Sequence, residues 1–168
     1  MYDNSHIIVR EANKSDVSII HKLAHATWQV AYKKILSVEQ LTYMLELIYS
    51  ESSLQKQIDS GHNFLIVEEE NIPIAFADYN KLRGDIYKLQ KIYVLPGQQG
   101  KGIGEMLIYY VIDKVKAQGA TTLLLNVNRE NKAKQFYEHL GFKVIGEEDI
   151  NIGEGYSMND YIMEKKLV

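Results

Sequence analysis

The chain places four of its 11 glycines within eight residues, at Gly97, Gly100, Gly102 and Gly104. A β-like run that ends at Pro96 comes before them, and a helical pattern follows. A glycine-rich turn that opens a helix presents backbone N–H groups without intrahelical partners, and the helix dipole favours negative charge there. The spacing therefore predicts an anion site, which we expect to hold a phosphate or pyrophosphate.

The well-known nucleotide-binding loops do not fit this stretch. A Walker A loop needs a glycine where Leu95 stands and a Ser or Thr where Gly102 stands. A dinucleotide-binding Gly-x-Gly-x-x-Gly that starts at Gly100 needs a glycine in place of Glu105. A tight turn that binds nothing stays an alternative for the loop taken alone. Other residues of the chain have to decide between an anion site and a turn that binds nothing.

A second group of polar and aromatic residues lies downstream. Asn126 ends an expected strand, Asn131 begins an expected helix, and Tyr137 shares the apolar face of that helix with Ala133. Each has an ordinary structural interpretation: a strand-end polar residue, a helix N-terminal residue, and a core aromatic whose hydroxyl finds a partner nearby.

Together the two stretches resemble the central motifs of the Gcn5-related N-acetyltransferase (GNAT) superfamily. In the first motif a Val-x-Pro strand end runs into Gln/Arg-x-x-Gly-x-Gly/Ala, matched by Gln99, Gly102 and Gly104. The second is Asn-x-x-Ala-x-x-Phe-Tyr-x-x-x-Gly-Phe, matched by Asn131, Phe136, Tyr137, Gly141 and Phe142, with Lys134 at the Ala position and Ala133 just before it. The N-terminal helical part with Trp28 and the ending DYIMEKKL look, more weakly, like PaiA-type polyamine acetyltransferases.

The resemblance implies an α/β fold with a mixed, mostly antiparallel central sheet, splayed between its fourth and fifth strands and flanked by helices. It also implies acetyl-coenzyme A as cosubstrate. The pantetheine arm would pair with the strand residues Ile92, Tyr93 and Val94. Tyr137 would return a proton to the departing thiolate. The remaining implied coenzyme contacts are backbone N–H groups for the pyrophosphate, a lysine charge and two asparagines: Gln99, Gly100, Lys101, Gly102, Ile103, Gly104, Glu105, Asn126 and Asn131.

An amine acceptor must lose a proton before it attacks. With the reference lysine pKa of about 10.4, only about one molecule in 2,500 is neutral at pH 7, a cost of roughly 4.6 kcal/mol. Many members of the superfamily have an acidic residue on the strand before the loop, but the matching position here is Gln90. Asp78 is a candidate base, and a water chain is an equal alternative. Trp28 and Tyr32 either line a pocket for a cationic acceptor or pack a helix on the sheet.

The composition excludes several classes of function. The net charge of -3, the pI near 6.0 and the scattered basic residues do not fit a nucleic-acid binder. With no Cys there is no disulfide, no thiolate nucleophile and no Cys-type zinc site, and no other metal site is visible. The sequence carries neither a signal-peptide pattern nor an apolar run of about 18 to 20 residues. We therefore expect a cytoplasmic protein without a membrane partner, and the superfamily adds a homodimer as an expectation.

The length of 168 residues fits one domain, and the resemblance implies a single N-acetyltransferase domain over residues 1–168. We expect strands at 6–11, at 63–80 as a hairpin, at 85–96, 121–127, 142–148 and 156–168. We expect helices at 17–31, from Ser37, from Ser52, at 103–119 and at 131–141.

The predicted reaction is acetyl transfer from acetyl-coenzyme A to a primary amine by direct attack, with a small amine or a polyamine favoured. Two alternatives stay open: a coenzyme-binding regulatory module without catalysis, and acetylation of a protein N-terminus or lysine.

Overall fold

Runs of apolar and β-branched residues build a seven-stranded sheet within residues 6–167, the part of the chain that the computed structural model describes. The strand order is β1-β2-β3-β4-β5-β7-β6, and every neighbouring pair is antiparallel except β4–β5. The strands are β1 (Ile7–Glu11), β2 (Asn63–Glu69), β3 (Ile72–Arg83), β4 (Ile86–Val94), β5 (Thr122–Asn128), β6 (Lys143–Gly153) and β7 (Tyr156–Lys166). The predicted mixed, mostly antiparallel sheet is confirmed.

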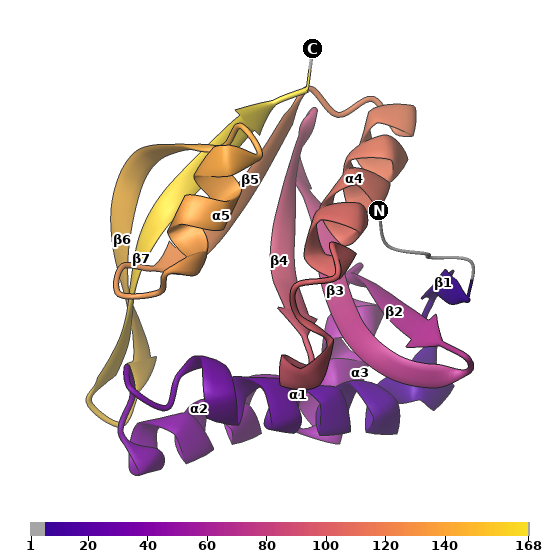
Figure 1. The fold of residues 1–168 in the computed structure, drawn as a ribbon. Coiled ribbons are helices and arrows are strands. Elements are labelled where there is room, and N and C mark those ends of the chain that lie inside the picture. The colour runs from indigo at the N-terminus through magenta and orange to yellow at the C-terminus, as the bar shows by residue number, and fades with distance from the viewer. Residues whose placement is uncertain (1–5, 168) are drawn as a thin grey trace.

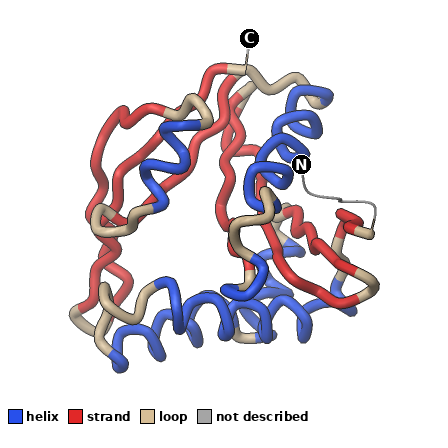
Figure 2. Tube along the Cα trace, in the orientation of Figure 1, coloured by secondary structure: helices blue, strands red, loops and turns tan. Residues whose placement is uncertain are grey.

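Helices cover both faces of this sheet (Figures 1 and 2). One face carries α1 (Val17–Ala31), α2 (Val38–Tyr49) and α3 (Glu51–Asp59), whose apolar residues pack with Phe64, Ile66 and Phe76. The other face carries α4 (Ile103–Ala117) and α5 (Ala133–His139). Two short 3-10 helices, η1 (Lys14–Asp16) and η2 (Pro96–Gln98), precede α1 and α4. No helix in residues 6–167 is both long enough and apolar enough to cross a bilayer.

The sheet opens between its two parallel strands. β4 pairs with β5 only from Ile86 to Leu89, and from Gln90 onward the two strands have no paired residues. On the other side of β4 the pairing with β3 shifts register, so that Gln90 is the extra residue of a bulge. Figure 1 shows the two strands diverging from the end at which the C-terminus lies. The predicted splay between the fourth and fifth strands is confirmed.

The local predictions hold with small differences. Ser37 caps α2 by accepting a hydrogen bond from the Gln40 backbone N–H at 3.1 Å. The cap of α3 is Ser50 and not Ser52, so that prediction is wrong by two residues, since α2 and α3 follow each other with Ser50 as the shared boundary. β6 runs five residues beyond the expected end at residue 148. Residues 1–5 and 168, which belong to the expected domain and last strand, lie outside the described residues.

Candidate active site

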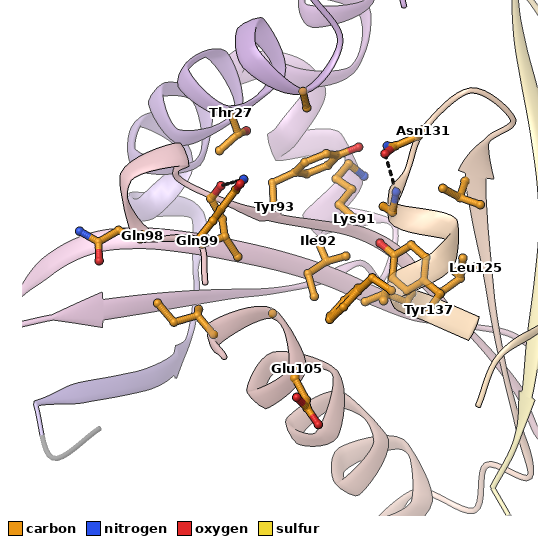
Figure 3. A pocket seen from close by; sticks show the side chains of 18 of the residues that line it. Thr27, Lys91, Ile92, Tyr93, Gln98, Gln99, Glu105, Leu125, Asn131 and Tyr137 are labelled. Carbon is orange, nitrogen blue, oxygen red and sulfur yellow. Dashed lines mark hydrogen bonds between the residues drawn. The ribbon is translucent and has the colours of Figure 1, made fainter. Parts of the chain in front are cut away.

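A cavity of about 600 Å³ lies where β4 and β5 part. Its walls come from the end of α1, the edge of β4, the glycine loop, the start of α4, the end of β5 and the start of α5. We call it the central cavity. Most residues expected at the site line it: Tyr32, Ile92, Tyr93, Val94, Gln99, Gly100, Gly102, Ile103, Gly104, Glu105, Asn126, Asn131 and Tyr137. Figure 3 shows Tyr93 and Lys91 on one side, with Asn131 and Tyr137 opposite.

The glycine loop opens α4 in a backbone conformation that side chains disfavour. Gly100 has φ +82° and Gly102, the N-cap of α4, has φ +77°. A Cβ built on either glycine would have no protein atom within 4 Å, so both face open space. Gly104 differs, because its Cβ would lie 3.4 Å from Cζ of Phe136. The loop therefore leaves the helix N-terminus bare toward the cavity, which is the arrangement that suits an anion.

The free edge of β4 offers backbone hydrogen-bonding groups to the central cavity. The Val94 carbonyl accepts a hydrogen bond from Nε2 of Gln99 at 3.3 Å, so it points away from β3. Because the direction of backbone groups alternates along an antiparallel pair, the N–H and C=O of Ile92 lie on the same edge. An extended ligand with amide groups can pair with this edge as an added strand.

Tyrosine hydroxyls gather at the other end of the cavity. The hydroxyls of Tyr32 and Tyr93 are 3.0 Å apart. Tyr137 is 8% exposed, and burial raises the pKa of its phenol well above the usual value. Its hydroxyl is therefore protonated at neutral pH, as a proton donor must be. Asn131 begins the turn into α5, where its Oδ1 accepts a hydrogen bond from the Ala133 backbone N–H at 2.9 Å.

A second cavity of about 350 Å³, which we call the side cavity, lies on the α1–α3 face. It shares with the central cavity the residues Tyr32, Gln90, Lys91, Tyr93 and Asn126. Trp28, expected at an acceptor pocket, lines the side cavity, with its ring 4.5 Å from that of Tyr32 and 5.7 Å from that of Tyr93.

Two expected residues line neither cavity. Nζ of Lys101 donates a hydrogen bond to Oε1 of Gln98 at 2.6 Å and lies 3.8 Å from the Glu69 carboxylate. Asp78 is fully buried on β3, where its Oδ2 accepts from Nζ of Lys91 at 2.8 Å and lies 2.5 Å from Nδ1 of His62. Its Oδ2 is therefore engaged behind the cavity wall, whereas its buried Oδ1 has no hydrogen-bond partner among the described residues.

Sequence reasoning missed several wall residues. In the side cavity the missed residue is Asp160. In the central cavity the missed residues are Thr27, Ala31, Leu89, Lys91, Gln98, Leu125, Val127, Ala133 and Phe136. Strand alternation could have given Leu125 and Val127, because both lie on β5 where the sheet opens. Nothing local marks Thr27 or Asp160.

The acetyltransferase (GNAT) domain family model matches residues 32–165. The chain belongs to the GNAT family. Membership agrees with the geometry, since the bare helix start, the free strand edge and the buried tyrosine converge on one cavity.

Among relatives of this GNAT protein, an uncharacterized N-acetyltransferase of Mycobacterium tuberculosis is 37% identical over 90 residues, which are 52% of this chain. The matched part is 57% of that relative, so the chain spans little more than half its length. A spermidine N(1)-acetyltransferase of Thermoplasma acidophilum is 26% identical over 166 residues, covering 95% of this chain and 97% of the relative.

Solved structures have the same fold. The PaiA N-acetyltransferase of Thermoplasma acidophilum in complex with coenzyme A aligns with a TM-score of 0.81 at 26% identity, over 95% of this chain and 98% of that one. A Gcn5-related N-acetyltransferase of Rhodopseudomonas palustris aligns with a TM-score of 0.82 at 21% identity, over 99% and 98% of the two chains.

Proposed function

We propose that this protein transfers an acetyl group from acetyl-coenzyme A to the primary amine of a small molecule, with a polyamine favoured, by direct attack of the amine on the thioester. The observation that carries the proposal is the convergence of three features on the central cavity: the bare start of α4, the free edge of β4 and the buried Tyr137. Two relatives support the proposal: the spermidine N(1)-acetyltransferase and the PaiA N-acetyltransferase in complex with coenzyme A.

Acetyl-coenzyme A is the acyl donor. Its pyrophosphate would lie on the N–H groups between Gln99 and Glu105, where glycines keep side chains out of the way. Its pantetheine amides would pair with the edge from Ile92 to Val94, where an amide N–H would replace Gln99 Nε2 at the Val94 carbonyl. Asn126 and Asn131 line the same cavity and are proposed as contacts of this arm.

The amine would enter from the side cavity, because that cavity meets the central one at Tyr32 and Tyr93. The neutral nitrogen attacks the thioester carbonyl, and a backbone N–H at the edge of β4 stabilises the oxyanion. When the C–S bond breaks, Tyr137 gives its proton to the thiolate and recovers one from the acylated nitrogen through solvent. The amide and free coenzyme A leave, and the one proton released overall is the one that the ammonium form of the amine lost to solvent before the attack. Trp28 and Tyr32 form part of the acceptor wall, and Asp78 holds Lys91 in place from behind.

Thiol release with acetyl-coenzyme A and a panel of amines tests this proposal. We expect turnover with small primary amines, and we expect Tyr137→Phe to lower kcat about 100-fold or more while the KM for acetyl-coenzyme A stays unchanged. Tyr109→Phe is the matched control, since Tyr109 is 48% exposed on α4 and lines neither cavity. Tight coenzyme binding without turnover on any amine would favour a regulatory module, for which Gln90 at the expected base position is the hint. Turnover only on peptides would favour protein acetylation.

We also propose that residues 1–168 act as one N-acetyltransferase domain in the cytoplasm, since the absence of Cys suits a reducing compartment. The homodimer stays a prediction that light scattering in solution checks.

A further inference from the structure

Asp160 is a buried residue at the wall of the side cavity, and its carboxylate can accept further hydrogen bonds. It lies on β7, opposite Asn128 of β5 and Glu148 of β6, and is 4% exposed. Its Oδ2 accepts one hydrogen bond, from Nδ2 of Asn126 at 3.2 Å. Within residues 6–167, its Oδ1 has no hydrogen-bond partner and no Lys, Arg or His nitrogen lies within 4.0 Å of the carboxylate. Burial raises the pKa of this carboxyl. A buried carboxylate with a free oxygen calls for a cationic partner.

The charges around Asp160 leave room for that partner. Lys88 of β4 lines the same cavity, but its ammonium lies more than 4.0 Å from the carboxylate and forms no ion pair with it, and burial lowers the pKa of this lysine. Arg129 is engaged by Glu147 at 3.2 Å and Asp149 at 2.5 Å. The ammonium of Lys91 already forms an ion pair with the buried carboxylate of Asp78.

The rest of the side cavity suits an organic cation. Its wall includes a cluster of four aromatic rings, in which the ring of Trp28 lies 4.5 Å from that of Tyr32, 5.3 Å from that of Tyr49 and 5.7 Å from that of Tyr93. Aromatic faces attract ammonium groups and pack against the methylene chain between them. Asp160 thus supplies the negative charge of the wall, which Lys88 and Lys91 also line, and the rings supply its apolar surface.

We propose that Asp160 and this aromatic wall bind a second, non-reacting ammonium group of the acceptor, so that the enzyme selects diamines and polyamines over monoamines. The inference rests on the proposed function. Tyr137 lines only the central cavity, and Asp160 lines only the side cavity. The carboxylate of Asp160 therefore does not bind the nitrogen that reacts. An extended diamine would reach both places through the junction, where Tyr32, Tyr93 and Asn126 line both cavities. Asp160 is therefore a specificity residue, not a catalytic one.

Calorimetric binding of 1,4-diaminobutane and butylamine to the enzyme loaded with coenzyme A tests the inference without requiring turnover. We expect the wild-type enzyme to bind 1,4-diaminobutane at least 10-fold more tightly than butylamine. Asp160→Asn should weaken diamine binding about 10- to 100-fold, the range for a lost charge-assisted hydrogen bond, and change butylamine binding less than about threefold. Glu148→Gln is the matched control, because this exposed carboxylate bonds the same Asn126 amide but lines neither cavity.

A second variant tests the site if Asp160→Asn fails to fold. Lys88→Met removes a positive charge from the same cavity as Asp160, so it should tighten diamine binding severalfold. Equal wild-type affinity for both amines, or equal weakening of both by Asp160→Asn, would overturn the inference. Weaker diamine binding by Lys88→Met would also overturn it. Failure of the proposed function is separate: it appears as absent thiol release whatever the amine affinities are.

Discussion

Gly102→Ala separates the fold of the glycine loop from its role in binding. Gly102 has φ +77°, and a Cβ there meets no protein atom within 4 Å. A left-handed conformation costs an alanine about 1–2 kcal/mol, and the stiffer unfolded chain returns about 0.4–1 kcal/mol. The net loss is therefore about 1 kcal/mol of unfolding free energy, or roughly 2–4 °C in Tm for a chain of this size. Gly155 is a matched control, since it has φ +79° and equally open surroundings in the β6–β7 turn.

Only the variant at the loop should lose coenzyme affinity. The new methyl group would stand over the first N–H groups of α4 and remove at least one charge-assisted hydrogen bond to phosphate, worth about 1.5–3 kcal/mol. We therefore expect the Kd of coenzyme A, measured by calorimetry, to rise about 10-fold or more for Gly102→Ala and to stay unchanged for Gly155→Ala. The same Kd in both variants would refute the assignment of the loop to the pyrophosphate.

Two further predictions concern stability. Hydrogen bonds from Arg10 hold the pKa of Asp16 below its unfolded value of 3.8, so this carboxylate stabilises the fold above about pH 4 and loses its effect as the pH falls through its lower folded pKa. Asp16→Asn should therefore lower Tm at pH 7 and flatten the fall of Tm toward pH 2, and an unchanged acid profile would contradict this. Leu107→Ala, at a fully buried position on α4, should cost about 2–5 kcal/mol in a urea titration, whereas a loss below about 1 kcal/mol would show that the core there can collapse.

Local patterns predicted the elements, and long-range pairing determined the rest. Apolar strand runs and helical stripes are properties of neighbouring residues, so most strands and helices could be predicted within a few residues. No local pattern tells that β7 lies between β5 and β6, and this insertion brings Asp160 to Asn126, 34 residues earlier in the chain. The same reason explains Lys101, whose expected phosphate contact competes with Glu69 from the distant end of β2.

The coenzyme side of the candidate site was more predictable than the acceptor side. A phosphate cradle depends on backbone groups and glycines within one stretch of chain, which the sequence displays directly. An acceptor pocket depends on side chains from several elements. Trp28 could be suspected from its position on α1, but Thr27 and Asp160 reach their cavities only through packing and strand order.

The glutamine at position 90 fits the proposed way of binding a diamine. An ammonium at Asp160 keeps its proton, since the carboxylate stabilises the charged form. The reacting nitrogen, at the junction beside Tyr32, would lose hydration without gaining a carboxylate, which lowers its pKa toward the reactive neutral form. The free energy gained by binding the second ammonium at Asp160 thereby offsets the cost of removing water from the reacting nitrogen.

A carboxylate at position 90 would stabilise the ammonium form of the reacting nitrogen. It would also lose the hydrogen bond that the Gln90 amide donates to Asn80 at 3.0 Å. We therefore expect Gln90→Glu to leave kcat/KM for 1,4-diaminobutane at pH 7 unchanged or to lower it. The pH profile of kcat/KM checks the reasoning, with Gln90→Met as the control for the lost hydrogen bond. A large gain for Gln90→Glu would mean that a missing base limits the reaction, and that desolvation of the amine is not what releases its proton.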